Sequence, residues 1–154
     1  MSTATTSLSD SLPSSIPKLD STGLNWAIFS VRFQDAVEVK GFWGHFDGKT
    51  PRPTSIPVTV TATDGTTSTV ADTAAEDQWD KDKRSAKSLL TQKIPDSTLM
   101  RVHTKRTVKV RWDAIVAEYT EKGAYAQTEL WTKFLESKYS PKASASLCEF
   151  LDSL

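Results

Sequence analysis

The residues that could carry chemistry are few and widely spaced in this chain of 154 amino acids. His45 and His103, the only two histidines, have neither metal-ligand nor catalytic-triad spacing, so each is expected to be structural or solvated. Cys148, the single cysteine, lies in an apolar-periodic segment and is expected to be a small buried hydrophobe. The run Asp-Gly-Thr at 64–66 has the residue types of the aspartic protease motif in the wrong order. We therefore predict no enzymatic activity, no cofactor and no metal site.

A basic segment between Asp96 and Asp113 is the one local charge asymmetry. Its cations at 101, 105 and 109 follow four-residue steps, so an uninterrupted helix would align them for contact with RNA phosphates. The simpler interpretation is a solvated face paired with acids elsewhere, because 19 Lys and Arg balance 19 Asp and Glu over the whole chain. The five candidate RNA contacts are Arg101, Lys105, Arg106, Lys109 and Arg111.

Length and composition indicate one modest domain, with 38% hydrophobic residues. One cysteine permits no internal disulfide, and the first 18 residues lack the apolar stretch of a signal peptide. No run approaches the roughly 20 apolar residues that a membrane-spanning helix needs. We expect an intracellular, cytoplasmic protein with no membrane partner and no small-molecule substrate.

Two segments are expected to lack stable structure. Residues 1–18 are rich in Ser, Thr and Pro, so we predict a disordered tail. Residues 51–73 contain many threonines and no aromatic residue, and we predict a flexible loop. The alternation of Val58, Val60 and Ala62 could form a transient strand, but no sheet partner is evident.

The remaining segments have helical periodicity. Asn25 is expected to cap a first helix with an inward stripe of Trp26, Phe29 and Phe33, and Gly41 is expected to end it. A tight aromatic turn around Trp43 follows. Four more helices are expected at about 73–93, from 96 or 97 to 102, from 108 to an end at Gly123, and at about 124–139. The positions of Trp26, Trp79, Trp112 and Trp131 in these helices predict core roles.

Several runs together resemble the Gag polypeptide of copia-type LTR retrotransposons. They are Leu-Asp-Ser-Thr-Gly-Leu-Asn-Trp at 19–26, Gly-Phe-Trp-Gly-His-Phe-Asp-Gly at 41–48, Thr-Pro-Arg-Pro at 50–53, and Thr-Val-Lys-Val-Arg-Trp at 107–112. The family-motif and core positions are Leu19, Asn25, Trp26, Phe29, Phe33, Trp43, Gly48, Pro53, Trp79, Thr107, Trp112, Leu130 and Phe150.

This resemblance implies an all-α bundle of about five helices, similar to a retroviral capsid domain, over residues 19–154. It also implies a structural protein that self-assembles into capsids or virus-like particles around element RNA. The alternative is a stand-alone Gag-derived module that binds a protein partner without forming particles. The family's Cys-Cys-His-Cys knuckle is missing, so zinc is not implied and we expect the domain to be truncated at its C-terminus. The apolar positions Leu147, Phe150, Leu151 and Leu154 begin a further helix, which we expect to promote self-association.

Overall fold

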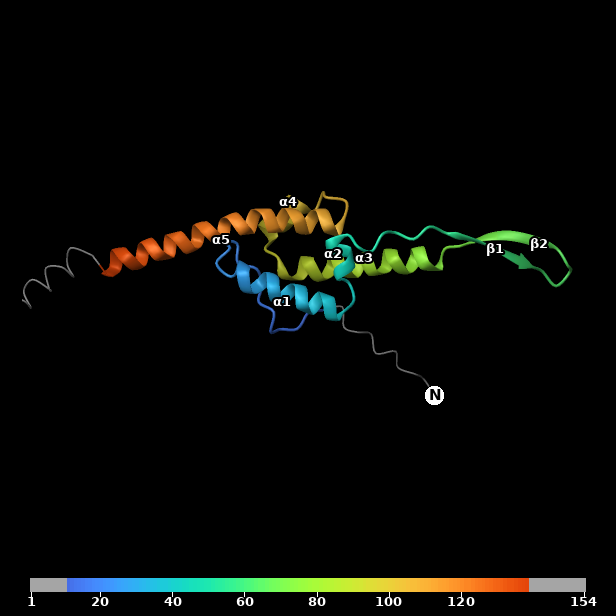
Figure 1. Cartoon of the computed structure of the whole chain (residues 1–154), viewed down its shortest axis with the longest axis horizontal. Helices are drawn as coiled ribbons and strands as arrows, with labels where there is room; N and C mark the ends of the chain where they lie inside the picture. Colours follow the sequence, from blue (N-terminus) through green and yellow to red (C-terminus); the bar gives the residue numbers. More distant parts are fainter. Residues whose placement is uncertain (1–10, 139–154) are drawn as a thin grey trace, which may run out of the picture.

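The computed structural model of the chain describes residues 11–138, which fold into five helices and one two-stranded hairpin. The mostly helical fold predicted from the sequence is confirmed. Figure 1 shows a central helical body, with the hairpin projecting at one end and the last turns of α5 at the other. The elements are α1 (Trp26–Val39), α2 (Trp43–Asp47), β1 (Ile56–Thr61), β2 (Thr67–Asp72), α3 (Ala74–Lys93), α4 (Asp96–Val102) and α5 (Val108–Lys138).

Aromatic rings surround Trp112 and join α1, α2 and α5. Trp112 is 7% exposed, and its ring lies 5.2 Å from that of Phe33 and 5.9 Å from that of Trp26 on α1. From α2, Trp43 and Phe46 lie edge-on to it at 5.7 and 5.8 Å. Such pairs add about 0.5–1.5 kcal/mol each beyond the area they bury. This cluster confirms the core roles predicted for Trp26 and Trp112, although Trp26 is only partly buried.

Helix α1 buries the predicted stripe of Phe29 and Phe33 and ends before Gly41, where φ is +77°. The expected capping by the Asn25 side chain is wrong. Its Oδ1 accepts a hydrogen bond from the Asp20 amide at 2.8 Å, and its Nδ2 donates to the Lys18 carbonyl at 2.7 Å. Asn25 therefore braces the preceding turn, and only its backbone carbonyl joins the helix, by accepting from the Phe29 amide.

The two helices expected on either side of Gly123 are one continuous helix, α5. Gly123 lies opposite Gly23, and a Cβ added to Gly123 would come 3.4 Å from the Gly23 carbonyl oxygen. A Cβ on Gly23, whose φ is +82°, would come 2.9 Å from the Cβ of Lys122. Because Gly123 has no side chain, the N-terminal loop can pack closely against α5. A glycine within a helix lowers the stability of the helix by only about 1 kcal/mol relative to alanine.

The expected disorder of residues 1–18 is wrong for residues 11–18, while residues 1–10 lie outside the described part. Leu12 and Ile16 are buried. The Lys93 ammonium donates to the carbonyls of Pro13 and Ile16, at 3.3 and 2.8 Å. The polar composition of this segment predicted that the entropy lost on ordering would keep it unfolded. Burial of Leu12 and Ile16 and the hydrogen bonds from Lys93 offset that entropy loss.

The expected flexible loop at 51–73 contains a β-hairpin. Ile56 of β1 pairs with Asp72 of β2, and the antiparallel register continues to the pair Thr61 and Thr67. The Asp-Gly turn between the strands places Gly65 at a φ of +84°. All strand residues are exposed, so the hairpin is held by its own pairing. The strand predicted around Val58 and Val60 therefore does have a sheet partner, which is β2, the next run of β-branched residues along the chain.

Helices α3 and α4 occupy the predicted ranges. Ile94 is buried beyond the end of α3, and Pro95 stops the helix. The expected cap of α4 by Asp96 or Ser97 is absent, because the Pro95 carbonyl accepts from the amides of Thr98 and Leu99 instead.

Replacing Trp112 by alanine should lower the free energy of unfolding by about 3–5 kcal/mol, because the change leaves a cavity among four aromatic rings. Trp131→Ala is the matched control, since Trp131 is 66% exposed, and should change stability by less than about 0.5 kcal/mol. Trp26→Ala and Trp43→Ala, partly buried, should fall between them. Urea denaturation measures all four, and equal losses for Trp112→Ala and Trp131→Ala would contradict this core.

Replacing residues 56–72 with a short Gly-Ser link should leave the stability of the helical body within about 0.5 kcal/mol of the parent. The ends of the hairpin pair with each other, so a short link can join them, and no strand residue is buried. Thermal denaturation followed by circular dichroism at a helix wavelength tests this. A large drop in melting temperature would mean that the hairpin packs against the body.

Candidate assembly surface and basic segment

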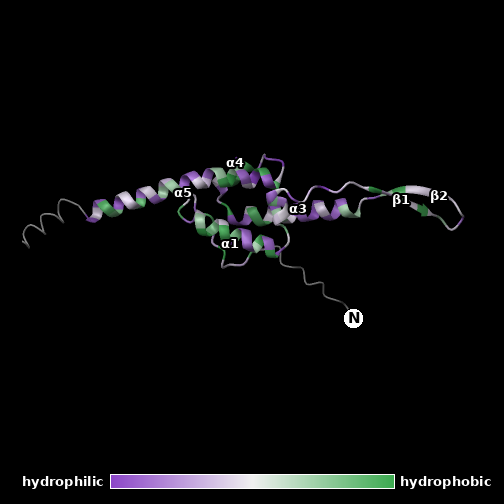
Figure 2. Cartoon of the chain, in the orientation of Figure 1, coloured by the Kyte–Doolittle hydropathy of each residue, from purple (hydrophilic) through white to green (hydrophobic). Residues whose placement is uncertain are grey.

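The far half of α5 carries an apolar stripe that nothing in the described chain covers. Every residue from 127 to 138 is exposed. Leu130 and Trp131 are 53% and 66% exposed, and Phe134 and Leu135 are about half exposed. The core role predicted for Trp131 is therefore wrong. Figure 2 shows hydrophobic residues continuing along α5 beyond the helical body.

The stripe is organised as a face, which we call the α5 face (Leu130, Trp131, Phe134 and Leu135). Its members follow three- and four-residue steps, and the ring of Trp131 meets that of Phe134 edge-on at 6.0 Å. Together with Gln127, three of them outline a depression of about 310 Å³. The opposite side of the helix is charged, with Lys133 paired to Glu129 at 2.7 Å.

A second apolar face lies on α1 and the turn before it. Leu24 and Ile28 are each 47% exposed and Val31 is 57% exposed. They follow steps of four and three residues, on the side of the helix opposite to Phe29 and Phe33. We call this set the α1 face.

The cations of the basic segment do not form one helical stripe. Arg101 belongs to α4 and Lys109 to α5, and a turn with a hydrogen bond from the Lys105 amide to the Val102 carbonyl separates the two helices. Arg101 is ion-paired with Glu118, and its Nε also donates to that carboxylate at 3.2 Å. Lys109 pairs with Asp113 at 2.6 Å.

Arg111 braces the turn between α4 and α5. Its guanidinium donates to the carbonyls of Lys105, at 2.9 Å, and His103. The residue is 6% exposed, and burial lowers its pKa, although a guanidinium remains charged at neutral pH. Arg106 is exposed and faces α3 across a pocket. Three of the five predicted RNA contacts therefore have partners within the protein. Arg101 and Lys109 pair with acids, and Arg111 donates to backbone carbonyls.

Most family-motif positions have structural roles. Thr107 caps α5, since its Oγ1 accepts from the Val110 amide at 3.1 Å. Gly48 has a φ of +79°, and a Cβ there would lie 2.7 Å from Cδ of Lys109. Trp79 is half-buried and donates from Nε1 to the Thr50 carbonyl at 3.0 Å. Leu19 is buried, Pro53 is half-buried, and Phe150 lies outside the described residues with Leu147, Cys148, Leu151 and Leu154.

The two histidines differ in burial, since His45 is packed in the fold and His103 is exposed. His45 is 9% exposed beside the ring of Trp79 at 5.2 Å, and burial lowers the pKa of its imidazole. The Nδ1 of His103 lies 2.6 Å from the Met100 carbonyl oxygen. Within residues 11–138, no three His, Cys, Asp or Glu side chains gather where they could hold a metal ion.

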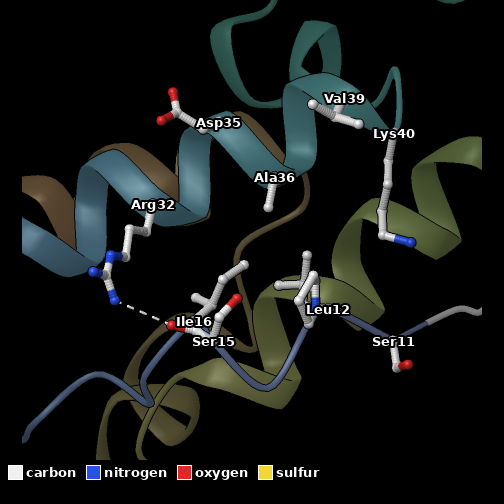
Figure 3. A pocket seen from close by; sticks show the side chains of 10 residues that line it. Ser11, Leu12, Ser15, Ile16, Arg32, Asp35, Ala36, Val39 and Lys40 are labelled. Carbon is white, nitrogen blue, oxygen red and sulfur yellow. Dashed lines mark hydrogen bonds between the residues drawn. The ribbon is translucent and has the colours of Figure 1, made fainter.

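A hollow of about 750 Å³ lies between α1 and the N-terminal segment (Figure 3). Leu12, Ile16 and Ala36 point into it, while Asp35 points away. Arg32 on α1 donates to the Ser15 carbonyl at 3.2 Å and ties the segment across the hollow. Its lining is therefore that of a packing seam, without converging polar side chains.

None of the helices within residues 11–138 is long and apolar enough to cross a bilayer. Although α5 has 31 residues, charged side chains occur throughout it.

Comparison with known proteins gives one match. No curated protein and no solved structure matches the chain. The family model for the gag-polypeptide of LTR copia-type matches residues 35–151. This range includes the aromatic turn, the tryptophan at the centre of the core and the α5 face. The chain therefore belongs to the copia-type LTR gag-polypeptide family.

Proposed function

We propose that this chain is a structural, non-catalytic Gag protein whose copies assemble into a capsid-like shell around element RNA. The observation that carries the proposal is the α5 face, an apolar stripe on a helix that projects from the body (Figure 1). A stripe of this kind on a protein surface marks an association site. Family membership favours a second copy of the chain as the occupant.

The energetics predict a weak contact. Four side chains that are each about half exposed contribute roughly 1 kcal/mol apiece when covered, so a symmetric pair gains roughly 8 kcal/mol. Association costs about 4–15 kcal/mol in lost translational and rotational freedom. A single α5–α5 contact is therefore too weak to hold two isolated copies together at low concentration. Many such contacts in one particle would reinforce one another.

A closed shell also needs a second contact. Two copies that pair through the same face form a two-fold dimer, which leaves that face satisfied and cannot grow. The α1 face supplies a separate apolar surface on the same chain. We assign α5–α5 pairing to dimers and α1 contacts to the joining of dimers into larger particles.

The basic residues give limited support for direct RNA contact by this domain. Arg101 and Lys109 are ion-paired and Arg111 is bound to carbonyls, so Lys105 and Arg106 remain as the predicted cations best placed for phosphates. Enclosure of RNA then depends on many weak contacts from the assembled shell, and most of this domain's surface serves protein contacts.

The test uses two variants of the full chain. Leu130→Ser, Trp131→Gln and Phe134→Ser combined should leave the protein monomeric, because the α5 face is lost. Ile28→Ser with Val31→Ser should stop assembly at dimers, which form only at high concentration because the α5–α5 contact is weak. Analytical ultracentrifugation over a range of concentrations, with electron microscopy of the fast-sedimenting fraction, distinguishes these states. RNA inside particles would be protected from added ribonuclease.

Met100→Ser is the matched control, since Met100 is 68% exposed on α4 outside both faces, and this variant should assemble like the parent. Circular dichroism establishes that each variant is folded. A parent chain that remains monomeric at high concentration would refute assembly through these faces. In that case the α5 face would belong to a stand-alone module that binds another protein.

A further inference from the structure

A pocket of about 380 Å³ lies between α3 and the start of α5. Its volume falls in the range of small-molecule sites. We call it the basic pocket, because five cations and one carboxylate line it: Lys83, Arg84, Lys87, Arg106, Arg111 and Asp80.

The spacing along α3 puts three of these cations on one helix face. Lys83 and Lys87 are four residues apart, an arrangement in which like charges destabilise a helix by about 0.2–0.5 kcal/mol. Arg84 lies beside them, with its Nε donating to the Asp80 carbonyl at 3.2 Å. Arg106, just before α5, adds a fourth cation from a segment distant in sequence.

The single acid in the pocket does not neutralise these charges. The Asp80 carboxylate is already ion-paired with Arg52 at 2.9 Å. Over residues 11–138, no acid lies within ion-pair distance of Lys83, Lys87 or Arg106. Arg111 is fixed by backbone carbonyls and forms a buried positive wall. The pocket therefore has an excess of positive charge, with Asp80 as its one acid.

We propose that the basic pocket binds a compact anion that carries adjacent phosphate groups, such as an inorganic or nucleoside triphosphate. Each phosphate group brings about −1.5 to −2 charges and three acceptor oxygens. Arginine forks bind such oxygens in pairs, and lysines add point charges.

A compact ligand fits better than an extended strand. Single-stranded nucleic acid spreads its charges along a groove and uses exposed aromatic stacking surfaces. Here the cations line one half-open hollow, and no aromatic side chain lines it. The bound anion would bridge α3 to the α4–α5 turn and remove the repulsion among their cations. This site is independent of shell assembly, because it involves neither the α5 face nor the α1 face.

The experiment is a titration of the full chain with sodium tripolyphosphate, followed by calorimetry and thermal denaturation. Binding should raise the melting temperature and should weaken steeply with added salt. Lys87→Gln with Arg106→Gln should weaken binding about tenfold or more, since two charge-assisted contacts are lost. Without ligand, this variant should be at least as stable as the parent, because like-charge repulsion is reduced.

The matched control is Lys81→Gln with Lys138→Gln, which removes two exposed charges outside the pocket and should bind like the parent. Binding that is equal in the two double variants would overturn the site. Citrate binding as tightly as tripolyphosphate would overturn phosphate recognition. Binding of a single-stranded oligoribonucleotide without binding of tripolyphosphate would overturn the compact ligand and assign the cations to a nucleic-acid backbone. No binding of either would overturn the proposal.

Discussion

The ring contacts of Trp112 are the interaction on which the rest of the structure depends. This side chain stands on α5 and is enclosed by rings from α1 and α2, so it fixes three helices at once. Its position requires the left-handed turn at Gly41, which brings α2 back against α1. Thr107 caps α5 one turn before it and sets where the helix begins. The family-motif residues thus act together to build one aromatic core.

The aromatic core contacts only the first half of α5. That half contributes to the stability of the fold, and the exposed second half is available for contact with other molecules. The helix is buried up to Tyr119, whose hydroxyl lies 2.6 Å from Oγ1 of Thr98 on α4. After Gly123, α5 extends past α1 and the N-terminal loop. The apolar side chains of the α5 face are therefore not covered by any other element within residues 11–138. Because packing and not propensity gives most helices their stability, an exposed extension of this kind gains from contact with another molecule.

Local periodicity predicted the helices well, but it could not show which apolar residues would find a partner. Trp112 and Trp131 have similar helical surroundings in sequence, and only the first meets α1 and α2. The same limit applies to Gly123, which resembled a helix end until its contact with Gly23 was known. Leu12 and Ile16 sit in a run of polar composition, and Lys93, distant in sequence, holds them in place. The hairpin was predictable in principle, since an Asp-Gly turn separates two β-branched runs.

The positions of the cations could not be predicted from their spacing in the sequence. Cations that are close in sequence lie apart in the fold, whereas cations that are distant in sequence lie together. Arg101 and Lys109 were separated by the turn between α4 and α5, and each found an acid. Arg106 instead lines a pocket together with the lysines of α3, which are distant in sequence. Two acids of α3, Glu76 and Asp80, both pair with Arg52, which precedes the hairpin. Asp80 lies in the same pocket but is paired with Arg52, and within residues 11–138 no acid lies within ion-pair distance of Lys83 or Lys87. A chain with balanced total charge therefore has a pocket lined by five cations and one acid.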